Sequence, residues 1–290
     1  MPIFVIRHVT TYHYRQPVAF GEHRMMLRPR DDGDQVVLDT ELAIDPPPRR
    51  IRWTRDRLGN HVATAEFDDR AAELRFESTI RLDHAAMNFA AHDIADHARV
   101  FPYRREADHP PVAPPPPVPA HPRVQSWAEG FLRADGTART YDLLVGMTQT
   151  IKSKFKHAAR HQHGIQKPEQ TLRLASGSCR DHALLMIAAL SHLGFAARFV
   201  SGYLYLAGDD DGEEAVLDGG NTHAWAQVYV PGPGWVDFDP SSGTVGNQNL
   251  VRVAVVDDPR EAIPLQGSWF GRSADHLAMK VAVKVAAARA

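Results

Sequence analysis

Residues 109–122 read HPPVAPPPPVPAHP, and this segment constrains the fold more than any other part of the sequence. Proline has no backbone amide donor and biases the residue before it towards extended conformations. Neither a helix nor a central strand can run through the segment, so we expect a stiff, polyproline-like connector. A chain of 290 residues is long for one compact domain, and the connector therefore predicts two domains, residues 1–108 and 123–290.

The part before the connector alternates apolar and polar residues in short runs, which is typical of strands with one buried face. Clusters of Pro, Gly or Asp separate the runs, and RLGNH has the composition of a hairpin turn. The pattern predicts an antiparallel β-sandwich or barrel. The predicted strands are FVIRHVTTYHY, EHRMMLRP, VVLDTELAI, RIRWTRD, HVATAEF and AELRFESTIRLD.

The part after the connector starts with helical spacing and ends with strand-like runs. Helices are predicted over residues 123–134, 140–157 and 178–194, the last one closed by Gly194. Helices followed by strands favour an α+β domain with the helices on one face of an antiparallel sheet. The predicted strands are AARFVSGYLYL, THAWAQVYV, GWVDFD, NLVRVAVV and HLAMKVAVKVA.

Composition and charge exclude several classes of protein. The 33 basic and 35 acidic residues give a net charge of -2 without a long basic run, which argues against a nucleic-acid partner. The single cysteine cannot form an internal disulfide, which fits a reducing compartment. No run approaches the roughly 20 apolar residues that span a bilayer, and the N-terminus lacks the apolar stretch of a signal peptide. We therefore expect a cytoplasmic protein without a membrane partner.

That cysteine, Cys179, stands at the predicted start of a helix. Ser178 and Asp181 match a capping box, so Cys179 falls on the first helical residue, where the helix dipole stabilises a thiolate. Its backbone amide is then the natural first donor to an oxyanion. The Asp181 carboxylate would raise the thiol pKa, so a cationic partner such as an imidazolium is needed. A small buried hydrophobic residue is the competing interpretation of Cys179.

His223 differs in context from the other histidines of the chain, which number 16 in all. It follows a glycine-rich segment and opens the strand-like run THAWAQVYV, which a Pro-Gly turn connects to GWVDFDP. Strand reversal in such a hairpin brings His223, near the start of one strand, to Asp239, at the end of the next. A base and its orienting carboxylate would then be neighbours, as in a catalytic triad.

The second strand of this hairpin offers two acids. Asp237 and Asp239 alternate with Val236 and Phe238, and the apolar pair is expected to face the helices. Asp237 lies mid-strand, whereas Asp239 lies about 6–7 Å further on, at the level of His223. Asp239 is therefore predicted to orient the histidine, and Asp237 to be a solvated or arginine-paired surface acid.

Ordered motifs along nearly the whole chain carry a family resemblance. The sequence GSCRDHA, followed by THAW and then GWVDFDPSSG, resembles the transglutaminase-like superfamily of Cys-His-Asp enzymes. The N-terminal part resembles the β-domain of a bacterial subgroup, and LGFAARFVSGYL is similar to that subgroup's segment after the catalytic helix. The N-terminal motifs are RHVTTYHYRQPV, HRMMLRPR, IDPPPRR, DRLGNHV and LRFEST.

The resemblance implies a papain-like α+β domain whose helix-borne cysteine packs on an antiparallel sheet. It implies Cys179 as nucleophile, His223 as base and Asp239 as the orienting acid, with a protein or peptide as substrate. One departure is Ser178 and His182, where the subgroup more often has a larger residue and an aromatic one, so the shape of the pocket is expected to differ.

No cofactor or metal is expected. His157 and His161 have the i, i+4 spacing of a helical metal pair, with His163 nearby, but no acidic base accompanies them as in HExxH. A solvated basic helix end is the favoured interpretation. The acidic segment GDDDGEE, residues 208–214, lacks the spacing of a calcium-binding EF-hand and is predicted to be a solvated loop.

Three classes of function remain open. An amidase or protease would let water resolve the thioester on Cys179, a transamidase would use an amine such as lysine, and a binding protein would keep the fold without catalysis. The presence of Cys, His and Asp counts against the third class. Hydrolysis is favoured because nothing in the sequence marks a dedicated amine channel.

Overall fold

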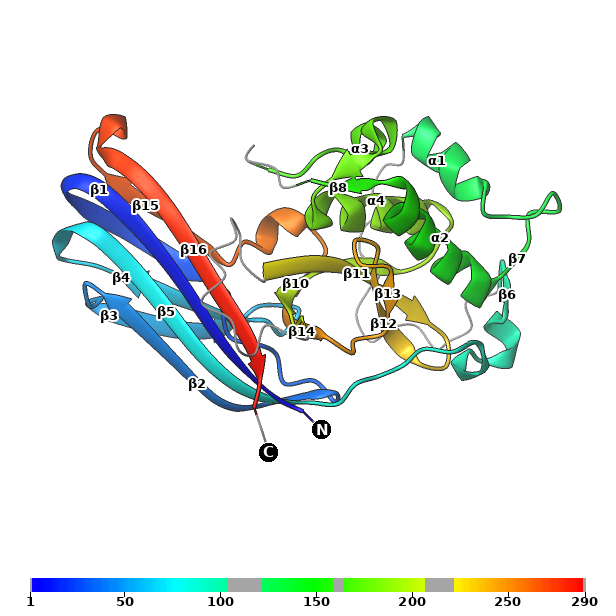
Figure 1. Cartoon of the computed structure of the whole chain (residues 1–290), viewed down its shortest axis with the longest axis horizontal. Helices are drawn as coiled ribbons and strands as arrows, with labels where there is room; N and C mark the ends of the chain where they lie inside the picture. Colours follow the sequence, from blue (N-terminus) through cyan, green and yellow to red (C-terminus); the bar gives the residue numbers. More distant parts are fainter. Residues whose placement is uncertain (1, 104–120, 159–163, 207–221, 289–290) are drawn as a thin grey trace.

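The computed structural model describes residues 2–103, 121–158, 164–206 and 222–288. A curled antiparallel sheet forms one side of the molecule and a group of helices the other, with a smaller sheet between them (Figure 1). The predicted α+β class, with a β-rich N-terminal part and a mixed second part, is confirmed. The N-terminal sheet is a curled half-barrel rather than a closed barrel or a two-sheet sandwich.

The curled sheet has the strand order β2-β5-β1-β4-β3, and two strands from the end of the chain also pair with β1. Its pairings are antiparallel, and the hairpin predicted at RLGNH joins β3 to β4, with Gly59 at φ +81°. The strands are β1 (Ile3–Met25), β2 (Gln35–Asp45), β3 (Arg50–Arg55), β4 (His61–Glu66), β5 (Arg70–His84), β15 (Leu265–Phe270) and β16 (His276–Ala287).

Strand β1 combines two runs that the sequence analysis separated. It continues for 23 residues, with one register shift against β5 between His13 and Val18. Pro17 lies in this shifted segment, where the regular ladder is interrupted, so its missing amide does not break the strand. The prediction of a strand break around Pro17 was therefore wrong.

The last two strands of the chain belong to the curled sheet. Strand β16 pairs with the first half of β1, from Phe4 to Tyr14, and β15 pairs with its second half. The expected division at the connector assigned these strands to the domain of residues 123–290. Their pairing with β1 differs from that expectation, because long-range strand pairing cannot be recognised from local alternation.

The second half of the molecule packs four helices against a five-stranded antiparallel sheet of order β13-β12-β11-β10-β14. The helices are α1 (Pro122–Glu129), α2 (Thr140–Lys154), α3 (Pro168–Leu174) and α4 (Cys179–His192). The strands are β10 (Ala197–Leu204), β11 (Thr222–Val230), β12 (Gly234–Asp239), β13 (Thr244–Val245) and β14 (Leu250–Val256).

Short elements connect these parts. Two-residue strands form an antiparallel pair, β6 (Val100–Phe101) with β7 (Ala138–Arg139), and a parallel pair, β8 (Lys156–His157) with β9 (Ser176–Gly177). Single turns of 3-10 helix lie at Ala91–Asp93, Asp96–Ala98, Pro259–Glu261 and Ser273–Asp275.

The helices differ from the predicted ones in several respects, and the helix predicted over 123–134 runs only from Pro122 to Glu129. The helix predicted over 140–157 ends at Lys154, and His157 lies in strand β8 instead. Helix α3 was not predicted. The end of the third predicted helix is correct, since Gly194 follows α4 with φ +90°, a left-handed conformation that favours glycine.

The five-stranded sheet is covered on both faces, as its position in Figure 1 indicates. The helices cover one face, in a core that includes Phe199 and Phe238. The curled sheet covers the other through a second core, which explains why all seven residues of β14 are buried. That second core contains Phe4, Ile6, Ile80, Leu82, Tyr203, Val251, Val253, Val283 and Val285.

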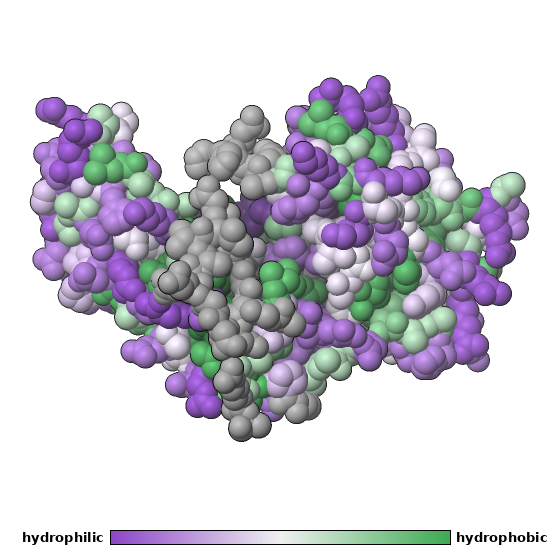
Figure 2. Space-filling model, viewed as in Figure 1, coloured by the Kyte–Doolittle hydropathy of each residue, from purple (hydrophilic) through white to green (hydrophobic). Residues whose placement is uncertain are grey.

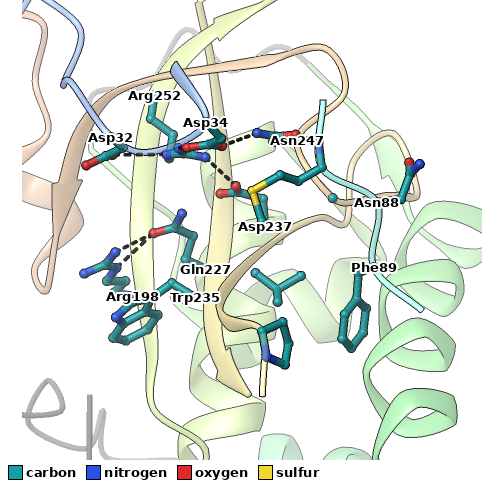
Figure 3. Close-up of a pocket in the computed structure, with 14 residues that line it drawn as sticks. Asp32, Asp34, Asn88, Phe89, Arg198, Gln227, Trp235, Asp237, Asn247 and Arg252 are labelled. Carbon is teal, nitrogen blue, oxygen red and sulfur yellow. Dashed lines mark hydrogen bonds and ion pairs between the residues drawn. The ribbon is translucent and has the colours of Figure 1, made fainter. Parts of the chain in front are cut away.

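A buried ionic cluster also joins the two halves, as Figure 3 shows. Arg252 on β14 donates to Asp237 on β12 at 2.8 Å and also binds Asp34, which precedes β2. Asp32 lies 3.4 Å from the same guanidinium. On the face that Figure 2 displays, hydrophilic residues cover most of the coloured surface.

Candidate active site

Cys179 is the first residue of α4 and is partly exposed. The turn before it is fixed by Asp181, whose carboxylate accepts hydrogen bonds from the Ser178 amide and hydroxyl, both at 2.9 Å, and from the Gln166 amide at 2.6 Å. Gly177 allows this arrangement, since a Cβ there would lie 2.8 Å from the Asp181 Cβ. The Asp181 carboxylate is thus held by three hydrogen bonds that shape the loop in front of the thiol.

His223 and Asp239 lie side by side at the ends of neighbouring strands, as the hairpin argument predicted. Nε2 of His223 lies 2.8 Å from Oδ2 of Asp239, whose side chain is fully buried. The Asp239 carboxylate also accepts from the Ser241 amide at 2.9 Å and from the Ser242 hydroxyl. With Nε2 bound to Asp239, Nδ1 is the His223 nitrogen left for the hydrogen bond to Cys179.

The structure therefore brings together the three predicted site residues, Cys179, His223 and Asp239. The His223 ring also stacks on the ring of the fully buried Trp225, and the two centroids lie 6.2 Å apart. This contact restricts the orientation of the imidazole. The indole Nε1 of Trp225 donates to Asp237 at 2.6 Å, so Trp225 is itself held in place.

The electrostatics of the site favour a charged pair. Burial alone would raise the pKa of the Cys179 thiol, but hydrogen bonds from His157 and His223 and from the Ala224 amide lower it to about 6. Burial alone would lower the pKa of His223, but Asp239 and the thiolate raise it to about 10. Between these values the pair exists as thiolate and imidazolium, which is the reactive form of a cysteine nucleophile.

Asp237 is engaged elsewhere. It accepts a hydrogen bond from Trp225 and another from Arg252, and the second belongs to the ionic cluster of Figure 3. The prediction that it is arginine-paired is confirmed, but it is not a surface residue, since only 4% of it is exposed. The expected orientation of β12 is confirmed, because Val236 and Phe238 pack in the core that contains the helices.

Sequence reasoning missed the place of His157 beside the thiol. It placed His157 in a solvated basic helix end, whereas His157 lies in strand β8 and lowers the pKa of the Cys179 thiol. The helical part of that interpretation is therefore wrong for His157. His161, His163 and the acidic segment 208–214 lie outside the described residues.

The described ranges contain no group of three or more His, Cys, Asp or Glu side chains arranged to hold a metal ion. Within those same ranges, no helix is both long and apolar enough to cross a membrane.

Comparisons with known proteins match both parts of the chain to transglutaminase-like families. Residues 4–83 match the bacterial transglutaminase-like N-terminal region, and residues 125–240 match the transglutaminase-like superfamily core. The chain combines a bacterial transglutaminase-like N-terminal region with a transglutaminase-like core domain. The core match includes Cys179, His223 and Asp239, and the resemblance noted in the sequence is thereby confirmed.

Relatives of this transglutaminase-like chain extend over most of its length. An uncharacterized protein of Mycobacterium leprae is 26% identical over 95% of this chain and 96% of its own. An uncharacterized protein of Mycobacterium tuberculosis H37Rv is 25% identical over 92% and 88%. A crystal structure from Cytophaga hutchinsonii, described as a "putative cysteine protease", has a TM-score of 0.69 at 19% identity, covering 100% of this chain and 91% of that one. This last similarity concerns the fold.

Proposed function

We propose that this transglutaminase-like protein is a cysteine-dependent acyl-transfer enzyme that hydrolyses peptide or side-chain amides. The observation that carries the proposal is the hydrogen-bonded series of Cys179, His223 and Asp239 at the N-terminus of α4. Each member has the environment its role needs. The thiol pKa is low, the imidazole is held by a buried carboxylate, and the nucleophile is partly exposed.

The reaction proceeds in two acyl transfers. The Cys179 thiolate adds to the amide carbonyl carbon, and the carbonyl electron pair moves to oxygen, which accepts a hydrogen bond from the Cys179 amide. Collapse of this intermediate breaks the C–N bond, and the His223 imidazolium gives its proton to the departing amine. Water then adds to the thioester as neutral His223 takes a proton from it, and the acid product leaves with the thiolate restored.

Hydrolysis is preferred to transamidation because water needs no binding site of its own, whereas an amine needs a channel that excludes water. The similarity in fold to a protein described as a "putative cysteine protease" supports the same choice. Transamidation uses the same thioester and the same three residues, so it is the second candidate.

The test uses the whole protein with a peptide library read by mass spectrometry, in the presence and absence of excess biotin-amine. We expect cleavage or deamidation products from wild type and none from Cys179→Ala. Predominant biotin-amine adducts at modest amine concentration would favour the transamidase. Undiminished product with Cys179→Ala, or no product with wild type, would contradict catalysis by this cysteine.

A further inference from the structure

The triad does not account for His157. Its side chain is exposed, yet it lies close enough to the Cys179 thiol to lower the thiol pKa, and it approaches from a different element than His223. The parallel bridge between β8 and β9 places His157 opposite Gly177, two residues before the nucleophile. The Ala158 amide donates to the Gly177 carbonyl at 2.9 Å, so the backbone that carries His157 is tied to the backbone that leads into α4.

The ring of His157 has a defined neighbour as well. It meets the ring of His182 edge-on, with centroids 6.1 Å apart and planes at 72°. His182 is buried, and its Nδ1 lies 3.2 Å from the Ser241 hydroxyl. Burial, assisted by the nearby His157, lowers the pKa of His182 to about 4. His182 is therefore uncharged at neutral pH, and its ring packs against the ring of His157.

His157 is not arranged as a second base. A histidine that works as a base in a triad is oriented by a carboxylate, as His223 is by Asp239. In the part of the chain that the structure describes, no carboxylate forms an ion pair with His157. The His157 ring therefore has an N–H available as a hydrogen-bond donor towards the reacting atoms.

We propose that His157 is the second oxyanion donor, which together with the Cys179 amide binds the oxygen of the tetrahedral intermediate; this inference rests on the proposed acyl transfer. That oxygen sits on the carbon bonded to the Cys179 sulfur. His157 lies opposite Gly177 and against the His182 ring, on both sides of Cys179 in the sequence, so its ring is within reach of that oxygen once the substrate has added. His157 supplies a hydrogen bond and transfers no proton, since His223 carries the proton to the leaving group.

The experiment separates oxyanion stabilisation from thiolate stabilisation by comparing two reagents. Acylation by p-nitrophenyl acetate passes through a tetrahedral oxyanion, whereas alkylation by iodoacetamide displaces iodide and does not. Wild type, His157→Phe, His157→Ala and His157→Gln are compared, each on the pH plateau where its thiol is ionised. The control is His97→Phe, an exposed histidine of the turn at Asp96–Ala98.

We expect His157→Phe and His157→Ala to slow acylation by about 10²- to 10³-fold, the usual effect of removing one oxyanion donor. Plateau alkylation should change by less than about tenfold, since only thiolate nucleophilicity is affected. His157→Gln should recover most of the acylation rate because its amide can donate, and His97→Phe should match wild type. Thermal unfolding checks that the variants are folded. His157→Phe and His157→Ala both lack a hydrogen-bond donor, so each one checks the result of the other.

The outcomes are distinct for the two proposals. If wild type forms the acetyl thioester and both donorless variants form it at the same rate, His157 is not an oxyanion donor and the acyl-transfer proposal stands. Equal losses of acylation and alkylation would likewise overturn the donor role, leaving His157 to stabilise the thiolate only. If wild type is alkylated at Cys179 but forms no acetyl thioester, both proposals are wrong.

Discussion

Asp237 and Asp239 lie two residues apart on β12, yet their carboxylates bind different partners. Asp239 holds Nε2 of His223 at 2.8 Å, and Asp237 binds Arg252 at 2.8 Å. The register explains the difference, because Asp237 pairs with Gln227 on β11, four residues beyond His223. Asp239 is the last residue of β12, one step beyond the pair of Phe238 with Ala226, and its side chain reaches His223 from there.

Substitution of the two acids should therefore reduce kcat to very different extents. Asp239→Asn should reduce kcat by about 10⁴-fold, because an amide there favours the wrong histidine tautomer. Asp237→Asn should stay within about tenfold of wild-type kcat in the folded protein, since Asp237 contacts Trp225 and Arg252 but not His223 itself. Steady-state kinetics on purified variants checks both, and the reverse ranking would overturn the assignment of the orienting acid.

The pH dependence follows from the charged pair. Activity should fall as pH decreases through about 6, where the Cys179 thiolate takes up a proton. It should also fall as pH rises through about 10, where His223 loses the proton that the leaving amine needs. The pair titrates as a unit, so the two limbs of the bell-shaped profile belong to both residues together.

His223→Ala tests that pairing without a substrate. Loss of the imidazolium should move the thiol pKa upward, towards its ordinary value of 9.0. The rate of iodoacetamide alkylation at pH 7 should then drop at least about tenfold, because less of the thiol is ionised. Cys179→Ala provides the unlabelled reference, and an alkylation profile identical to wild type would show that His223 does not pair with the thiol.

The local features of the site could be predicted from the sequence. The start of α4 at Cys179 and its end before Gly194 depend on capping residues within a few positions. The approach of His223 to Asp239 depends on one hairpin. Both features depend on residues that are close together in the sequence, so they can be recognised from one sequence alone.

The rest depends on pairing between distant segments. His157 reaches the thiol only because β8 and β9 pair in parallel, about twenty residues apart in the sequence. The return of β16 to β1 joins the two ends of the chain. Neither pairing leaves a periodic pattern, since alternation shows that a segment is a strand but not which strand lies beside it.

Gly202 on β10 leaves room for Trp225, whose ring stacks on the imidazole of His223. A Cβ at this residue would lie 1.9 Å from the Val251 carbonyl oxygen and 2.9 Å from the Trp225 ring. Gly202→Ala should therefore lower the free energy of unfolding by at least about 1–3 kcal/mol, the usual cost of overpacking, and reduce kcat in the folded fraction. Gly146→Ala in α2 is the matched control, because its Cβ has space and alanine favours helices.

Denaturant unfolding and kinetics measured on the same samples check this prediction. A Gly202→Ala protein with wild-type stability and kcat would show that the strand accommodates the methyl group without moving Trp225.

Arg252 is expected to contribute more to stability than any exposed arginine, because it neutralises buried carboxylates between the two sheets. Its side chain is 5% exposed, and Asp34 and Asp237 beside it are 9% and 4% exposed. Arg252→Met would leave both acids buried without their cation, which typically costs about 3–5 kcal/mol. Arg260→Met is the control, since Arg260 is 85% exposed and solvent screens its pair with Asp258.

The two variants should be compared by urea unfolding at pH 7 and again at about pH 4. Acid protonates unpaired carboxylates, so part of the loss in Arg252→Met should be regained relative to wild type as the pH falls. The Arg260→Met difference should stay small at both pH values. Equal stability of the two variants at pH 7 would show that the buried acids find other partners, and that the junction between the sheets depends on its apolar core alone.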